Sequence, residues 1–311
     1  MKVKSIILLM NAIFLILSAC SEKKKQEKVN THKKASYEQI VTPTYELEKP
    51  QGTASAVLVL FGGYPEVASD IKREFNILKA AQQHNIAVLY SNYNRKLWFE
   101  NNELETLAQQ LNQIFTTHHL ATDNVFFGGF SSGGNVALLL GNHLTASQNK
   151  LKPKGIFIVD SPIDLAVLYQ SAEKNVNRNF SDVSVQEGRF LLQLLGDRFG
   201  NPAEAMETYE KYAVFTSETN HTDNLSSLKN TKLRFYTEPD TLWWQKERMA
   251  SYEQMNAYYI QQLAQKLTAE NFTHVEYIPT ENKGYRANGE RHPHSWSIVD
   301  VAELIKFMLI E

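Results

Sequence analysis

Short runs of apolar residues recur along the chain and alternate with stretches in which apolar residues repeat every three or four positions. Six such runs consist mainly of apolar residues, which is typical of strands buried on both faces of a sheet. They cover residues 56–61, 86–91, 125–128, 155–160, 233–237 and 274–278. The segments between them have helical spacing, as in Leu104, Leu107 and Leu111. This alternation predicts a mostly parallel, doubly wound α/β sheet with helices on both faces.

Two parts of the pattern differ from this repeat. Residues 37–50 are expected to add one or two antiparallel strands at an edge of the sheet. Residues 165–232 contain no strong strand signal but include helical runs at 185–195 and 203–212. Connections of this length inside a compact domain usually have their own structure and often serve function. We therefore expect one α/β domain over residues 37–311, with a mainly helical cap inserted at about 165–232.

The first 36 residues have the pattern of a signal peptide followed by a flexible linker. A basic start, a short apolar run and small residues at its end are typical of a secretory signal over residues 1–19. The four residues at 17–20, Leu-Ser-Ala-Cys, resemble the lipobox of bacterial lipoproteins, which implies that Cys20 is acylated after cleavage. Residues 20–36 are polar and lysine-rich, so they are expected to form a flexible tether. The prediction is a protein of the bacterial cell envelope, anchored to a membrane by lipid on Cys20.

Charge and cysteine content narrow the classes of function. Residues 1–36 carry eight lysines and two glutamates, a net +6, so the remaining residues carry −8 of the chain's total of −2. An acidic body argues against binding to nucleic acid, which needs a cationic face. The single cysteine excludes an intramolecular disulfide and a cysteine-based zinc cluster. No motif requires a metal or another cofactor, and nothing in the pattern indicates an oligomeric state.

The strongest motif follows the third predicted strand. Residues 129–133 read Gly-Phe-Ser-Ser-Gly, a G-x-S-x-G pattern between a strand and the helical stretch 135–144. In this context the glycines permit a sharp turn that exposes the hydroxyl of Ser131 at the positive end of the helix. Ser132 is a weaker candidate, because its own frame places Phe130 where the motif has glycine. Ser131 is therefore the candidate nucleophile.

With this motif in this position, residues 37–311 resemble the α/β-hydrolase superfamily, whose catalytic residues follow the order serine, acid, histidine. The resemblance implies a histidine between the last strand and the last helix. His292 and His294 both lie there. We favour His294 because it adjoins the helix start and is followed by Ser-Trp, as in many hydrolases of this superfamily; His292 is the alternative.

The acid has three candidates. The superfamily places it just after the strand predicted at 233–237, where Asp240 fits best and Glu238 competes. Asp160, at the end of the preceding strand, is the third candidate, because some members of the superfamily take the acid from that position. The expected triad is Ser131, Asp240 and His294, with Glu238 and Asp160 as alternatives for the acid.

The resemblance also implies an oxyanion hole made of two backbone N–H groups. One would come from Gly63 or Tyr64, in the Gly-Gly-Tyr-Pro loop after the first buried strand, and the other from Ser132. The loop lacks the histidine that often leads this motif in the superfamily. Around the site, Trp243, Trp244 and Trp296 are candidates to line the pocket, and Arg286 and Arg291 are candidates to bind a substrate carboxylate.

These features together predict a serine hydrolase that forms an acyl-enzyme on a small-molecule substrate, most simply a carboxylic ester. Amide hydrolysis and acyl transfer use the same parts and stay open. The alternative from another class is a ligand-binding envelope lipoprotein that keeps the fold without the chemistry. A fold alone does not decide between these.

Overall fold

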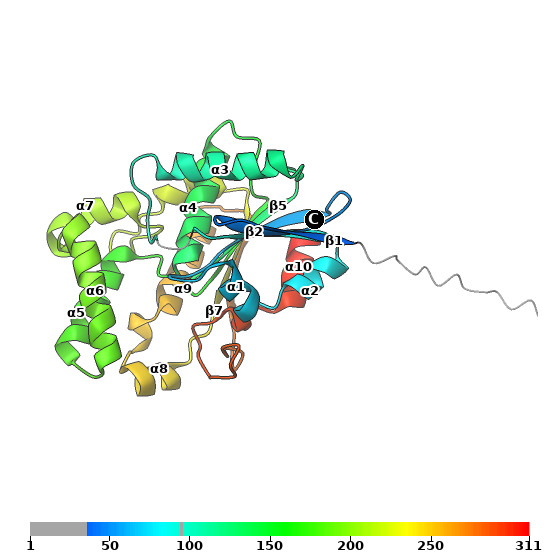
Figure 1. The fold of residues 1–311 in the computed structure, drawn as a ribbon. Coiled ribbons are helices and arrows are strands. Elements are labelled where there is room, and N and C mark those ends of the chain that lie inside the picture. The colour runs from blue at the N-terminus through cyan, green and yellow to red at the C-terminus, as the bar shows by residue number, and fades with distance from the viewer. Residues whose placement is uncertain (1–35, 94–95, 311) are drawn as a thin grey trace, which may run out of the picture. The chain divides into compact units, whose positions relative to one another are not determined.

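The computed structural model describes residues 36–93 and 96–310. The strands and helices alternate over most of this range (Figure 1). The strands are β1 (Tyr37–Val41), β2 (Tyr45–Pro50), β3 (Ala56–Phe61), β4 (Ile86–Ser91), β5 (Val125–Phe130), β6 (Gly155–Val159), β7 (Lys232–Thr237) and β8 (Val275–Pro279). The helices are α1 (Ala68–Glu74), α2 (Leu78–Gln83), α3 (Glu103–Thr117), α4 (Ser132–Ala146), α5 (Leu165–Arg178), α6 (Asp182–Phe199), α7 (Pro202–Tyr212), α8 (Thr241–Arg248), α9 (Asn256–Ala269) and α10 (Val301–Leu309). Three short 3₁₀ helices are η1 (Asp223–Leu228), η2 (Tyr252–Gln254) and η3 (Trp296–Ile298).

All eight strands form one sheet in the order β1-β2-β4-β3-β5-β6-β7-β8. The pairs from β4 through β8 are parallel, and the hairpin β1–β2 adds two antiparallel strands at one edge. The expectation of a mostly parallel sheet with antiparallel edge strands is confirmed. Because the parallel strands all run the same way, their carboxyl ends lie along one edge, where parallel α/β sheets place their functional loops.

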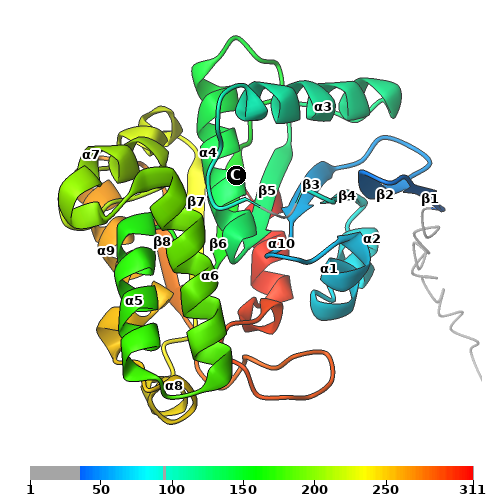
Figure 2. The same ribbon diagram turned by 60° about the vertical axis from the view of Figure 1, so that its left-hand side comes forward.

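Two hydrophobic cores cover the two faces of the sheet, and β3 shows how the sequence divides between them. Val57 and Val59 belong to the core on one face, which also contains side chains of α3, α4 and α9. Leu58 and Leu60 pack on the other face against α1, α2 and α10. Figure 2 shows α3 and the pair α1–α2 on opposite sides of the sheet. Both faces are buried, which explains the continuous apolar runs in the strands.

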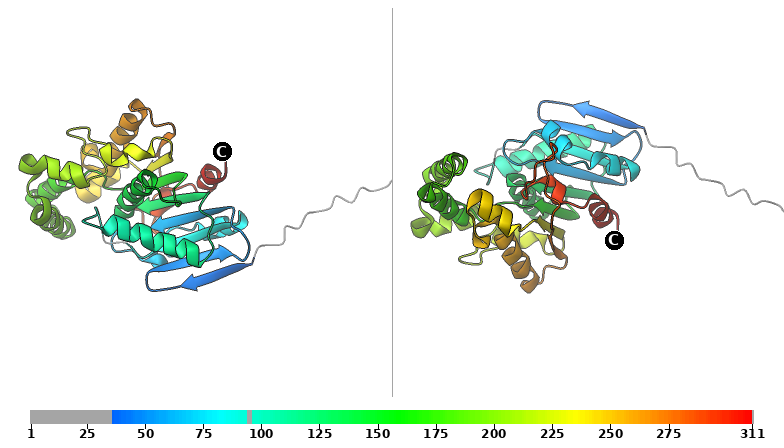
Figure 3. Two further views of the ribbon diagram at one scale, coloured as in Figure 1. Left: turned by 90° about the horizontal axis from the view of Figure 1, so that it is seen from above. Right: turned by 90° about the horizontal axis from the view of Figure 1, so that it is seen from below.

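Helices α5, α6 and α7 lie between β6 and β7 in the sequence, so the expected insertion is mainly helical. In Figure 3 these helices, drawn green to yellow-green, stand at the other end of the domain from the blue strands β1 and β2. They have their own small apolar cluster, which includes Leu165, Leu195, Phe199 and Tyr209, and which Trp98 joins from the loop after β4. The insertion therefore packs as a cap beside the carboxyl ends of the strands.

Within residues 36–93 and 96–310, no helix is both long and apolar enough to cross a membrane. The signal segment 1–19, Cys20 and nearly all of the predicted tether lie outside the residues that the structure describes.

Candidate active site

Ser131 occupies a sharp turn between β5 and α4. Its backbone has φ 51° and ψ −128°, a conformation that residues with a side chain rarely adopt. Its N–H still donates to the Val159 carbonyl (2.9 Å), which continues the ladder between β5 and β6 up to the serine itself. Ser131 is also the residue before the first turn of α4, so its side chain stands at the positive end of that helix. The local sequence therefore builds the sharp turn that the motif predicted, with a half-buried Ser131 at its tip.

The glycines of the motif allow this turn because there is no room for side chains. A Cβ built on Gly129 would lie 2.1 Å from the Gly133 carbonyl oxygen, and one on Gly133 would lie 2.2 Å from the Phe61 carbonyl oxygen. Strand β5 and helix α4 thus approach each other more closely than any other residue would permit.

His294 is held by a carboxylate. Its Nδ1 lies 2.6 Å from Oδ2 of Asp160, the residue directly after β6. Asp160 is buried, and its φ of 47° turns the chain so that the side chain leaves the strand direction at this edge of the sheet. The His294 ring packs on Phe130, the residue before Ser131, with ring centroids 4.5 Å apart. With Nδ1 bonded to the carboxylate, Nε2 is left to exchange protons.

The structure does not bring Asp240 to the histidine, which corrects the expected triad. Oδ2 of Asp240 pairs with the Arg291 guanidinium at 2.6 Å, and its Oδ1 accepts the Trp243 N–H at the start of α8. Asp240 is thus a helix cap and an ion-pair partner. The third candidate, Asp160, occupies the position that Asp240 was expected to fill.

Glu238, the second candidate, also lies elsewhere. Its buried carboxylate accepts the N–H groups of Lys283 and Gly284 and pairs with Arg291 at 2.6 Å. Arg291 in turn donates to the Gly284 carbonyl (2.7 Å). These contacts hold the loop that carries the histidine, so Glu238 and Arg291 have a structural part here. The same bonds engage Arg291, which was expected to face a substrate.

The candidate oxyanion donors are reduced from three to two. The Gly63 N–H donates to a carboxylate oxygen, Oε2 of Glu66 (2.9 Å), which competes with an oxyanion more strongly than a hydroxyl acceptor does. The Tyr64 N–H points to Ser132 and donates to its Oγ (3.0 Å). The Ser132 N–H is the first of helix α4 and has no acceptor within that helix. Tyr64 and Ser132 are therefore the two backbone donors beside Ser131 that a developing oxyanion can recruit.

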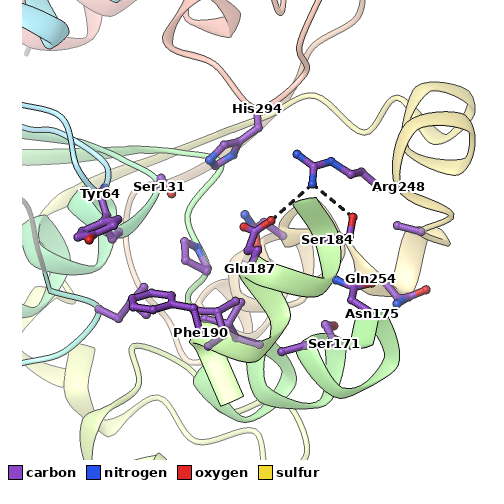
Figure 4. Close-up of a pocket in the computed structure, with 18 of the residues that line it drawn as sticks. Tyr64, Ser131, Ser171, Asn175, Ser184, Glu187, Phe190, Arg248, Gln254 and His294 are labelled. Atoms are coloured by element: carbon purple, nitrogen blue, oxygen red, sulfur yellow. Dashed lines mark hydrogen bonds and ion pairs between the residues drawn. The ribbon is translucent and has the colours of Figure 1, made fainter. Parts of the chain in front are cut away.

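A cavity of about 520 Å³ opens between these residues and the cap. Ser131, Ser132, His294 and Tyr64 form one wall, and α5 and α6 form the opposite wall. Figure 4 shows Ser131 and His294 facing this space together, with Tyr64 to one side and Phe190 of α6 below it. The rings of Tyr64 and Phe190 stack at 6.1 Å across the boundary between the main domain and the cap. Both rings line the cavity.

Comparison with known proteins settles the fold. No protein-family model matches the chain, and no curated protein matches it. Carboxyl esterase 2 of the fungus Tuber melanosporum matches with a TM-score of 0.54 at 15% identity, over 92% of this chain and 88% of that one. An esterase of the bacterial hormone-sensitive lipase family matches with 0.51 at 14%, over 89% and 84%. Fluorophosphonate-binding serine hydrolase F of Staphylococcus aureus matches with 0.50 at 14%, over 89% and 99%.

The chain has the α/β-hydrolase fold. In this α/β-hydrolase fold the three tryptophans have different places. Trp244 lines the cavity, and Trp243 packs on His292 with ring centroids 4.8 Å apart. Trp296 is fully buried, stacks on Phe75 and donates from Nε1 to Glu66. Of these three, only Trp244 is placed to touch a ligand directly; the fourth tryptophan, Trp98, also lines the cavity.

His292 also lines the cavity but has no carboxylate on its ring. Burial lowers its pKa to about 3, and the positive charges of Arg286, His294 and Arg248 act in the same direction. The imidazole is therefore neutral at pH 7. His294, with Asp160 on Nδ1, is the histidine placed for proton transfer.

The cap and helix α8 also bring polar residues to the cavity that the sequence did not single out. They include Ser171 and Asn175 of α5, Ser184 and Glu187 of α6, and Arg248 of α8. Their one sequence signal is spacing, since Ser171 and Asn175 are one helical turn apart, but many surface residues share that spacing.

Proposed function

We propose that the protein is a serine hydrolase that cleaves carboxylic esters through an acyl-enzyme. The observation that carries the proposal is the 2.6 Å contact between Asp160 and His294, together with a serine on a strained turn that lines the same cavity as His294. The esterases and the serine hydrolase among the solved structures of similar fold support the same class of reaction.

Each of the three residues has a defined part in the proposed reaction. Oγ of Ser131 attacks the ester carbonyl carbon while Nε2 of His294 takes its proton. Asp160 keeps the imidazole in the tautomer with the proton on Nδ1 and stabilises the cation that forms. His294 then gives the proton to the leaving alcohol, and water releases the acyl group by the same steps in reverse order.

The oxyanion of the intermediate binds the N–H groups of Tyr64 and Ser132. In the structure the Ser132 hydroxyl accepts the Tyr64 N–H, so it must rotate away or share that donor when substrate is bound. The Ser132 hydroxyl is thereby a positioning group for the Gly62–Pro65 loop. Its removal is expected to change the rate far less than removal of the Ser131 hydroxyl.

The test is labelling with a fluorophosphonate probe and turnover of 4-nitrophenyl butyrate, both with the protein lacking residues 1–36. Ser131→Ala is expected to abolish labelling and to lower kcat on the order of 10⁶-fold. His294→Ala should cost a similar factor, and the double variant little more, because the groups act as a unit. Ser132→Ala is the matched control and should still label. Absence of labelling in folded wild-type protein contradicts the proposal and favours the binding-protein alternative.

We also propose that the enzyme works in the bacterial cell envelope, held by a lipid on Cys20. The support is the Leu-Ser-Ala-Cys sequence at 17–20 after a short apolar run, followed by a lysine-rich stretch. Lysines beside an acyl anchor add attraction to anionic lipid.

A further inference from the structure

The cavity beside Ser131 is lined unevenly. Apolar side chains of Leu97, Trp98, Leu168 and Leu194 belong to the cluster between the cap and the loop after β4. Polar side chains gather elsewhere in the same cavity. Figure 4 shows Arg248 with Ser184, Gln254, Asn175 and Ser171 on the side of Ser131 that lies away from Tyr64.

Arg248 faces this polar part with few bonds of its own. Its Nη1 reaches Oγ of Ser184 and Oε2 of Glu187 only at 3.5 Å. Arg291, by comparison, makes two ion pairs at 2.6 Å and a 2.7 Å bond to a carbonyl. A guanidinium has five N–H donors, so most of those on Arg248 have no acceptor within the described residues. Long, single contacts of this kind leave the cation able to bind another anion.

The polar side chains around Arg248 also have donors or acceptors without a hydrogen-bond partner among the described residues. The side chains of Ser171 and Asn175 line the cavity and make no hydrogen bond to any other residue that the structure describes. The Ser184 hydroxyl is buried and accepts a hydrogen bond from the Ser181 hydroxyl. Its own proton has no acceptor among the described residues, so it can bond to a ligand. Glu187 is the only carboxylate among the residues that line this cavity, and its side chain is 60% exposed. Lys96, the other cation of the lining, is paired with Glu103 at 2.8 Å.

The position of Arg248 relative to the histidines indicates whether it contacts the alcohol part or the acyl part of an ester. The positive charge of Arg248 is close enough to His292 to contribute to lowering the pKa of that ring. The His292 ring is in turn 6.3 Å from the ring of His294. A histidine acting as general acid protonates the leaving oxygen, so the alcohol part of the ester lies on the histidine side of Ser131. Tyr64, the oxyanion donor, lies on the other side (Figure 4).

We propose that Arg248 binds an anionic group, carboxylate or phosphate, on the alcohol part of the substrate, while the acyl part lies among the apolar side chains. Charge-assisted bonds from a guanidinium suit both anions, and Ser184 and Asn175 supply further donors. This inference rests on the proposed ester hydrolysis, and it names the class of substrate: an ester of an apolar acid with an anionic alcohol.

The test compares 4-(butyryloxy)benzoate and 4-(butyryloxy)phenyl phosphate with the neutral methyl ester of the first. For each protein the readout is the ratio of kcat/KM for the anionic ester to that for the neutral ester, which cancels effects common to both. Arg248→Gln is expected to lower this ratio about tenfold or more, as for a lost charged hydrogen bond. Arg248→Lys should restore part of the ratio, and Glu187→Gln should raise it. Arg189→Gln removes a charge from the exposed face of α6 and should leave the ratio unchanged.

A second pair of esters places the anion on the acyl side: mono-4-nitrophenyl glutarate against 4-nitrophenyl butyrate. Dependence on Arg248 only for this pair overturns the assignment to the alcohol part, and no dependence in either pair overturns the subsite. A fall in the ratio for the phosphate only, or for the carboxylate only, identifies which anion the subsite takes and supports it.

Binding separates this inference from the proposed function. The affinity of 4-hydroxybenzoate for Ser131→Ala protein, measured by calorimetry, needs no turnover. Weaker binding after Arg248→Gln in that background supports the subsite even if neutral esters are never hydrolysed. Equal affinity with and without the guanidinium overturns it, provided both proteins melt at similar temperatures.

Discussion

Asp160 and Asp240 follow neighbouring parallel strands, yet they have different partners. Asp160 contacts His294, whereas Asp240 caps α8 and pairs with Arg291. Asp160→Asn is expected to lower kcat on the order of 10⁴-fold, because the amide holds the wrong tautomer of the imidazole. Asp240→Asn loses a partly buried ion pair that does not touch His294, so its kcat should stay within about tenfold of wild type. Steady-state hydrolysis of 4-nitrophenyl butyrate by the two variants checks this, and a larger loss in Asp240→Asn contradicts the assignment.

The sequence could not separate these two carboxylates for a physical reason. Both come just after a strand of the parallel sheet, so both reach the same edge. What distinguishes them is the backbone turn at Asp160, with φ 47°, and the presence of Arg291 near Asp240. Neither the turn at Asp160 nor the position of Arg291 can be predicted from the residues around these two carboxylates. Ser131 and its turn could be predicted because the glycine spacing itself encodes the tight approach of β5 and α4.

His292 makes stability depend on pH. Its pKa is lowered to about 3, chiefly by burial, against about 6.5 in an unfolded chain. Between these values the unfolded state binds a proton that the folded state does not, so the free energy of unfolding should fall as pH falls from 6.5 towards 3. His292→Phe keeps a ring beside Trp243 and removes the ionisable group.

The measurement is urea unfolding of wild type and His292→Phe at pH 8, 7, 6, 5 and 4. The difference in free energy between the two proteins should be constant above pH 7 and should shift in favour of the variant below pH 6.5. Parallel curves over the whole range would show that the ring gains its proton equally in both states.

Among the elements, the strands were easiest to predict and α8 was missed. Strands β3 and β4 are buried along their whole length on both faces, so their sequences are continuous apolar runs with clear ends. Helix α8 buries no residue, so it has no apolar stripe for a pattern to detect. The sequence pattern therefore predicts no helix in this segment, whereas it is a short helix that carries Arg248 to the cavity.

The strand–turn–helix element has a steric requirement that two glycine substitutions can test. A Cβ at Gly129 would lie 2.1 Å from a backbone carbonyl, so Gly129→Ala must force β5 and α4 apart and should cost about 3 kcal/mol or more. Gly196 lies inside α6, where a Cβ would meet only the Tyr169 ring at an ordinary 3.5 Å. Gly196→Ala should therefore stabilise the protein by up to about 1 kcal/mol. Urea unfolding of both variants checks the opposite signs, and a tolerated alanine at 129 would contradict the packing described for the turn.

At the scale of the whole molecule, the cap and the main domain each contribute residues to the same cavity. The main domain supplies Ser131 and Asp160 from the ends of β5 and β6, and His294 from the loop between β8 and α10. The cap supplies the opposite wall of the cavity from α5 and α6. The alternation of strands and helices and the helical insertion could be predicted from the pattern, because buried strands are continuous apolar runs and amphipathic helices are periodic. The lining of the cavity could not, because it depends on how the cap helices turn against the sheet.

The last prediction concerns how the whole chain is held in the cell. If Cys20 is acylated, full-length protein should incorporate a labelled fatty acid and sediment with membranes, and Cys20→Ala alone should lose the label. Because an uncleaved apolar signal can itself retain a protein in a membrane, release is tested with a variant that combines Cys20→Ala with a cleavable secretory signal in place of residues 1–19. After a high-salt wash, which removes the electrostatic attraction of the lysines, this variant should be found in the soluble fraction. Its kcat on 4-nitrophenyl butyrate should equal that of wild type, since every residue assigned to the site follows Tyr37. Ser21→Ala is the matched control and should stay labelled and membrane-bound, whereas fatty-acid label on Cys20→Ala protein would contradict the proposed anchor.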